Sequence, residues 1–204
     1  MKGWGWSLLA LMIAATAGGC DAGGEAGDAS RQQLTTAGFS DSVSARLAKL
    51  KLTDDEMKQV IASRQSNISE TMIADMVATM HAKDLRYEYV SEDVQTLMRQ
   101  NVGALTVTKL IDMGAIPSWT SEIMALKVDS VSDVAIIEIA QLKFKEKKEV
   151  LSGGEYGMLK RRGFSDAGLL EFVRKGGTAQ QLQTVADEIQ HGKPEQEAMK
   201  AAGL

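Results

Sequence analysis

Apolar residues recur with helical spacing in many short stretches between residue 38 and the C-terminus. In the clearest example, Leu182, Val185, Ala186 and Ile189 fall at i, i+3, i+4 and i+7, which places them on one face of an α-helix. Ser, Thr or Asp often precedes such a stretch and Gly often follows it, as expected for residues that cap and end helices. The pattern therefore predicts a succession of short amphipathic helices.

One part of this pattern occurs twice. The tetrapeptide Gly-Phe-Ser-Asp stands at residues 38–41 and again at residues 163–166. In the same register, Thr53 in the first window and Thr178 in the second each begin a capping box. Each window predicts a helical hairpin of roughly 28 residues. All short amphipathic helices resemble one another, but the shared cap favours a true repeat, and a repeat of this length is typical of stacked helical pairs.

The segment from Val134 to Phe144 is the place where a strand is an alternative. It is rich in Ile and Val and partly alternates, which a strand would also do. The Ser132-Asp133 pair in front of it and the lysines after it favour a helix. We therefore predict an all-α fold over residues 38–204, with short helical hairpins stacked as a compact bundle or short α-solenoid.

The N-terminus has a different character. Lys2 precedes an apolar run over residues 8–17, which has about the length of a signal-peptide core and is too short to span a bilayer. Residues 17–20 then read Ala-Gly-Gly-Cys and end in the single cysteine of the chain. This stretch resembles the signal of bacterial lipoproteins, with Ala17 at the position where that signal usually has Leu.

The resemblance implies removal of a signal peptide at residues 1–19 and attachment of diacylglycerol to the Cys20 sulfur, usually with a further acyl chain on the new amino group. Such an anchor would hold the protein on a membrane of the bacterial cell envelope, outside the cytoplasm and on the periplasmic side in a Gram-negative cell. Ordinary secretion after cleavage at residue 17 is the alternative, and it would leave Cys20 as an unpaired thiol. Residues 20–37 contain almost no large apolar side chain, so we predict a flexible linker there.

Composition excludes several functions. The formal net charge is −4, so the chain lacks the basic footprint of a nucleic-acid-binding protein. The sequence contains no phosphate-binding loop, no Gly-x-Ser-x-Gly elbow and no His-Glu-x-x-His motif. We therefore expect a protein that is not an enzyme and has no cofactor. The expected function is a membrane-anchored helical domain that presents a surface to an unidentified protein partner.

Two groups of residues are candidates for a more specific role. Met72, Met76 and Met80 recur every four residues with His81 beside the last, and thioethers with an imidazole suit Cu(I). This gives an alternative function as a copper- or small-molecule-binding lipoprotein, whereas the simpler interpretation is that the methionines fill a helical core. The second group is basic and would face an acidic partner or anionic headgroups, unless it is only a solvated helix face; its members are Lys143, Lys145, Lys147, Lys148, Lys160, Arg161 and Arg162.

Overall fold

The computed structural model describes residues 22–204, with side chains from residue 27 onward. Cys20 and the preceding residues, on which the signal and lipid-anchor predictions depend, lie outside this range. Twelve α-helices fill the described part: α1 (Ala22–Thr36), α2 (Asp41–Ala48), α3 (Asp54–Gln65), α4 (Glu70–His81), α5 (Ser91–Arg99), α6 (Ala104–Asp112), α7 (Thr120–Val128), α8 (Asp133–Ala140), α9 (Gly153–Arg161), α10 (Asp166–Arg174), α11 (Ala179–Gln190) and α12 (Glu195–Ala201). A 3₁₀ turn (Tyr87–Tyr89) precedes α5, and a π-helical turn (Gln141–Lys145) extends α8.

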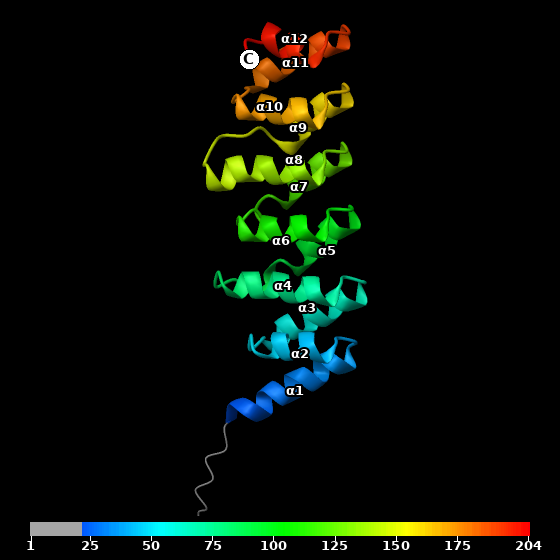
Figure 1. Cartoon of the computed structure of the whole chain (residues 1–204), viewed down its shortest axis with the longest axis vertical. Helices are drawn as coiled ribbons and strands as arrows, with labels where there is room; N and C mark the ends of the chain where they lie inside the picture. Colours follow the sequence, from blue (N-terminus) through cyan, green and yellow to red (C-terminus); the bar gives the residue numbers. More distant parts are fainter. Residues whose placement is uncertain (1–21) are drawn as a thin grey trace, which may run out of the picture.

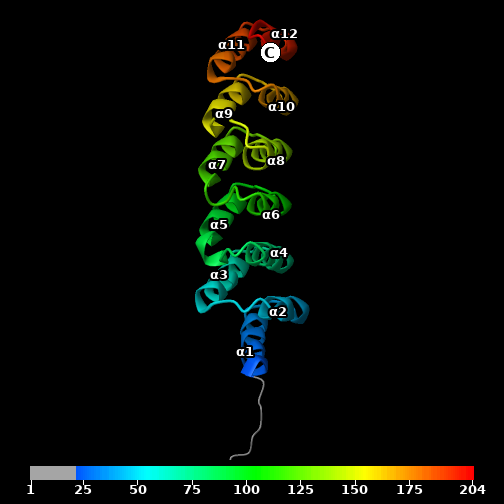
Figure 2. The ribbon, with the colours of Figure 1, turned by 90° about the vertical axis from the view of Figure 1, so that its left-hand side faces the viewer.

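Each odd-numbered helix pairs with the even-numbered helix that follows it, and the six pairs are stacked along one axis (Figure 1). Turned by 90°, the stack shows the odd helices from α3 to α11 in one column and the even helices in the other, with α1 beneath both (Figure 2). The described part of the chain is therefore all-α, and the prediction of stacked helical hairpins is confirmed.

A left-handed residue follows every helix and turns the chain back along the stack. Within residues 22–204, twelve residues have positive φ, and the residue after each one usually donates its amide to a carbonyl of the helix just completed. Phe39 bonds in this way to Leu34 (3.2 Å) and Phe164 to Leu159 (3.0 Å). This is the Schellman ending of a helix. The twelve residues are Gly38, Lys51, Asn67, Asp84, Asn101, Gly114, Ser130, Lys147, Gly163, Gly176, Gly192 and Gly203.

The repeat seen in the sequence is present in the structure, but the two helices of each window belong to successive pairs of the stack and do not pack as one hairpin. Both windows contain two helices joined by a turn, α2 and α3 in the first and α10 and α11 in the second. Thr53 and Thr178 both form complete capping boxes. Phe39 and Phe164 are both buried, because each one follows a left-handed glycine and turns back onto the core. The segment 134–144 is also helical, as predicted.

The linker prediction for residues 20–37 is wrong for the described residues, because Ala22–Thr36 forms α1. Alanine, glutamine and arginine favour helix strongly enough to offset several glycines. Leu34, the one large apolar residue of this helix, is fully buried, and α1 packs along α2. The helical domain therefore begins with α1 and not at residue 38, and Gly38 ends the first helix of the stack.

Carboxylates connect neighbouring even helices at their N-termini. The first residue of one even helix accepts the amide of the N-cap residue of the even helix before it. Glu70 accepts from Ser40 (2.6 Å), Asp133 from Gly103 (2.6 Å) and Asp166 from Ser132 (3.0 Å), and Glu195 accepts from Ser165. We call these contacts the N-cap ladder.

The ladder has one gap and one end. Ala104 occupies the first position of α6 and has no oxygen to offer Ser69, the N-cap residue of α4. At the C-terminal end, Pro194 is the N-cap residue of α12. A proline has no amide hydrogen, so α12 has no N-cap amide that a carboxylate could accept from.

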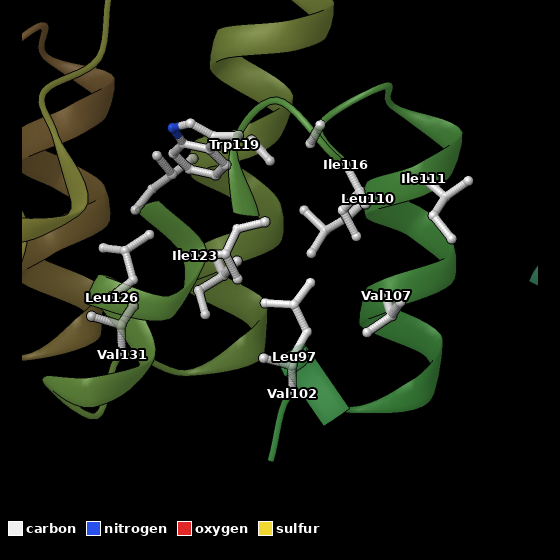
Figure 3. Packing of buried hydrophobic residues seen from close by; sticks show 14 of the residues in the cluster. Leu97, Val102, Val107, Leu110, Ile111, Ile116, Trp119, Ile123, Leu126 and Val131 are labelled. Carbon is white, nitrogen blue, oxygen red and sulfur yellow. The ribbon is translucent and has the colours of Figure 1, made fainter. Parts of the chain in front are cut away.

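The hydrophobic core runs between the two columns of helices. Figure 3 shows its central part, where Leu97, Leu110 and Ile123 from α5, α6 and α7 point toward one another. Trp119 lies edge-on to Phe144, with ring centroids 5.9 Å apart. On the other side, α9 approaches α7 so closely that a Cβ atom on Gly153 would lie 2.3 Å from the Glu122 carbonyl oxygen.

Candidate functional site

Two long connections interrupt the regular stack, and both lie on the same edge. One joins α4 to α5 over residues 82–90 and the other joins α8 to α9 over residues 141–152. Both leave the C-terminal end of an even helix, on the left-hand side of Figure 1. We call this side the insertion edge. In repeat proteins, insertions of this kind collect on one face, and that face is often the one that binds.

A buried carboxylate holds the first insertion in place. Glu56 of α3 is fully buried and accepts hydrogen bonds from four donors. His81 Nε2 (2.8 Å) and the Tyr87 amide (3.1 Å) lie against one oxygen, while the Thr53 amide (3.1 Å) and Arg86 Nη1 (3.2 Å) lie against the other. A buried charge is tolerated only when it is paired and hydrogen-bonded, and here α3, α4 and the insertion all contribute donors.

The electrostatics of this centre follow from its contacts. Burial by itself would raise the pKa of Glu56, but the bonds from the Thr53 amide, His81 and the Tyr87 amide hold the pKa below its ordinary value. The Tyr87 hydroxyl meets Ser63 Oγ at 2.8 Å, and burial raises the pKa of Tyr87 to about 12. Both oxygens of the Glu56 carboxylate accept hydrogen bonds that fix α4 and the first insertion to α3, so the role of Glu56 is structural.

The anchored insertion displays apolar side chains to solvent. Tyr89 is 73% exposed, and Leu85 is also exposed. Exposing such side chains on a segment fixed by Glu56 brings no gain in core packing. Their fixed position suits contact with another molecule, because a pre-ordered surface loses less entropy on binding.

An acidic residue of the intervening repeat connects the two insertions. Asp112, at the end of α6, pairs with Lys83 (3.3 Å) from the first insertion and with Lys145 (3.5 Å) from the second. The pKa of Asp112 lies below its ordinary value, chiefly because of the hydrogen bond from Lys83. Beside the second insertion, a surface groove of about 430 Å³ is lined by Lys143, Glu149, Val150, Leu151, Gly176, Gly177, Thr178 and Ala179.

The predicted basic surface does not exist as one patch. Lys143, Lys145, Lys147 and Lys148 lie on the insertion edge. By contrast, α9 ends at Arg161, and the turn that follows it with Arg162 lies at the opposite ends of the helices (Figure 1). The three basic residues at the end of α9 are also bonded to other residues of the chain. Lys160 pairs with Asp166 (2.8 Å), Arg161 with Asp129, and Arg162 bonds to Gln190. Helices that reverse direction in every hairpin separate residues that are close in sequence.

The methionine stripe lies inside the core. Met76 and Met80 are fully buried and Met72 nearly so, which agrees with the interpretation of the stripe as a packing face. The His81 imidazole is directed to Glu56. Among residues 27–204, no group of three or more His, Cys, Asp or Glu side chains has the arrangement of a metal site.

Sequence reasoning identified the helix caps but missed the centre that they build. Thr53 and Glu56 were recognisable as a capping box, yet nothing in the spacing indicates that His81, Arg86 and Tyr87 would also converge on Glu56. The exposed Tyr89 was hidden in a stretch that reads as an irregular connection. The available signal was the pair Tyr87 and Tyr89, two aromatic residues in a connection that otherwise reads as irregular.

Comparisons with known proteins give no family for this chain. No protein-family model matches the chain, and no curated protein matches it. Within the described residues, no helix has both the length and the apolar character needed to cross a membrane.

Proposed function

We propose that this protein is a lipid-anchored protein of the bacterial cell envelope whose helical stack binds a protein partner through the insertion edge. The observation that carries the proposal is the pair of exposed apolar side chains, Leu85 and Tyr89, on an insertion that Glu56 fixes to the stack. The lysines of the second insertion extend the same edge. Aromatic side chains are enriched at protein interfaces, where a polar rim surrounds them.

The anchor is the second part of this proposal, and it is supported by the resemblance of residues 1–20 to a lipoprotein signal. Cys20→Ser should abolish incorporation of a labelled fatty acid and release the protein from membranes. Intact-mass analysis that finds the wild-type chain cleaved after Ala17 and carrying no lipid would contradict the anchor.

Site-specific cross-linking tests the binding surface. A photoreactive amino acid at position 89 in the intact cell should capture a partner, and the same group at exposed position 58 of α3 should not. Leu85→Ser should reduce the cross-link and lower thermal stability only slightly, because the side chain is partly exposed and is not in the core cluster. Equal cross-linking from positions 89 and 58 would show that the insertion edge is not the binding surface.

A further inference from the structure

Carboxylates outnumber basic side chains around the first insertion. Residues 51–58 lead into α3 and begin it, and residues 83–93 contain most of the insertion and the first turn of α5. The Thr53 hydroxyl donates to a Glu88 carboxylate oxygen (3.0 Å), which brings the two segments together beside the exposed Tyr89. Together the segments carry seven acidic and four basic side chains. The exposed part of the first insertion is therefore surrounded by net negative charge.

Most of the basic side chains are already paired with carboxylates of the chain. These pairs are Lys58 with Asp55 (2.8 Å), Lys83 with Asp112 (3.3 Å) and Arg86 with Glu56 (3.2 Å). Five acids of the two segments form no ion pair with any residue of 27–204 and are at least partly exposed, namely Asp54, Asp84, Glu88, Glu92 and Asp93. Lys51 remains as a base, and adding Lys49 from the preceding turn still leaves the carboxylates in excess. We call these five carboxylates, together with Leu85 and Tyr89, the acidic surface.

The second insertion has the opposite charge, although few of its cations are free. Residues 141–152 carry four lysines and two glutamates. Lys145 pairs with Asp112 (3.5 Å) and Lys148 with Glu146 (3.0 Å). Asp112 also holds Lys83 of the first insertion, so it lies between the two insertions. The insertion edge thus changes sign along the stack, and the acidic surface occupies the part around the first insertion.

We propose that the acidic surface binds a segment of the partner protein in which Lys or Arg side chains stand beside apolar ones. This partner chemistry rests on the proposed function, because it concerns the same edge of the stack. Opposite charges favour such a segment and set its register. A Lys or Arg side chain can also lie over the face of the Tyr89 ring, while Leu85 offers an apolar contact. Because Glu56 fixes the insertion to the stack, the surface is ordered before the partner binds.

Other occupants fit the acidic surface less well. An anionic membrane surface would be repelled by its five carboxylates. A second copy of the chain would have to offer its second insertion, where only Lys143 and Lys147 form no ion pair within residues 27–204. An uncharged apolar segment would cover Leu85 and Tyr89, but it would take the neighbouring carboxylates out of water without a counter-ion. A basic segment with apolar neighbours satisfies both kinds of side chain.

Peptide binding to the purified full-length chain, in an uncharged detergent, tests the partner chemistry. The probes are a fluorescent peptide in which Arg and Ala alternate and the same peptide with Glu at every Arg position, compared by fluorescence anisotropy. The wild-type chain should bind the Arg peptide at least about tenfold more tightly than the Glu peptide. Glu92→Lys and Tyr89→Ser should each weaken binding of the Arg peptide at least about threefold.

Glu197→Lys is the matched control for Glu92→Lys. It makes the same change of charge at an exposed acid in the first turn of α12, and it should leave the affinity for the Arg peptide unchanged. Equal affinities of the wild-type chain for the two peptides, or equal effects of Glu92→Lys and Glu197→Lys, would overturn the proposal.

Photo-cross-linking in the intact cell provides the second readout. The photoreactive amino acid at position 89 should attach to a segment of the partner, and mass spectrometry of the cross-linked peptide identifies that segment. Lys and Arg should outnumber Asp and Glu in it. A captured segment without that excess, or one from a second copy of this chain, would overturn the proposal. Neither result removes the insertion edge as a binding surface, whereas equal cross-linking from positions 89 and 58 would, so the two claims fail separately.

Discussion

Glu56 shows how much one residue can do in a fold built from small helices. Its carboxylate closes the cap of α3 and also fixes Arg86 and Tyr87 of the first insertion. The sequence indicated the capping role, because the Thr53–Glu56 spacing is local. It did not indicate the other contacts, since they depend on how α4 and the insertion fold back over α3. The burial of Phe39 and Phe164 was predictable for the opposite reason, as each immediately follows a glycine that ends a helix.

Glu56→Ala should destabilise the protein by about 3 kcal/mol, because it leaves buried donors without their acceptor. Urea unfolding monitored by circular dichroism measures the change. The exposed neighbour Asp54 provides the control, and Asp54→Ala should cost less than about 1 kcal/mol. Equal losses in the two variants would show that the Glu56 contacts add nothing beyond helix capping.

The lowered pKa of Glu56 also predicts a pH dependence. In the folded protein, the pKa of Glu56 lies below its ordinary value of 4.5. The carboxylate therefore stabilises the fold fully above pH 4.5, and this contribution is lost as pH falls through the pKa that Glu56 has in the folded protein. The urea midpoint should therefore drop between pH 5 and pH 3. In Glu56→Gln the drop should be smaller, and an identical drop would place the acid sensitivity elsewhere, for example at Asp133 or Asp166, whose pKa values are also lowered.

At the scale of elements, the N-cap ladder explains why the even helices stack in register. The sequence places an acid at the first position of most even helices, which alone suggests only a favourable interaction with the helix dipole. The structure shows a second use, because the same carboxylate reaches the N-cap amide of the preceding repeat. That partner lies 30 to 34 residues away, so local pattern could not identify it.

Asp133→Ala tests one rung of the ladder. It removes the acceptor of the Gly103 amide and the partner of Lys127 (2.5 Å), and should cost about 1 to 2 kcal/mol. Asp41→Ala is the matched control, since Asp41 holds the same first position in α2 and no even helix precedes it within the described residues. The difference between the two variants in chemical denaturation removes the shared dipole effect and measures the rung together with the Lys127 pair.

The close contact between α7 and the start of α9 requires that Gly153 has no side chain. In Gly153→Ala the new Cβ would meet the Glu122 carbonyl oxygen at 2.3 Å, whereas at the adjacent Gly154 it would meet nothing within 4 Å. We expect Gly153→Ala to destabilise by about 2 kcal/mol, in the range of overpacked cores. Gly154→Ala should be neutral or stabilise by up to about 1 kcal/mol through helix propensity. Thermal unfolding of the two variants measures both stability changes. If both variants change stability in the same direction, the close approach of α9 to α7 is contradicted.

At the scale of the whole molecule, the all-α stack was predictable from the apolar periodicity and the repeated cap. The start of the domain was not, because α1 contributes a single large apolar residue to the core. The grouping of the basic residues was also not predictable, since the direction of each helix decides on which edge a lysine emerges. Stacking repeats instead of folding them around one centre has a further consequence. Each repeat contacts only its neighbours, so stability is shared locally.

Hydrogen exchange of two matched variants tests this architecture most directly. Phe39→Ala and Phe164→Ala remove equivalent buried side chains from repeats near opposite ends, at a cost of about 3 to 5 kcal/mol each. Phe39→Ala should speed amide exchange in α1 to α4 and leave α9 to α12 protected, while Phe164→Ala should do the reverse. If either substitution accelerates exchange evenly from α1 to α12, the molecule folds around one shared core and the account of a stacked solenoid is wrong.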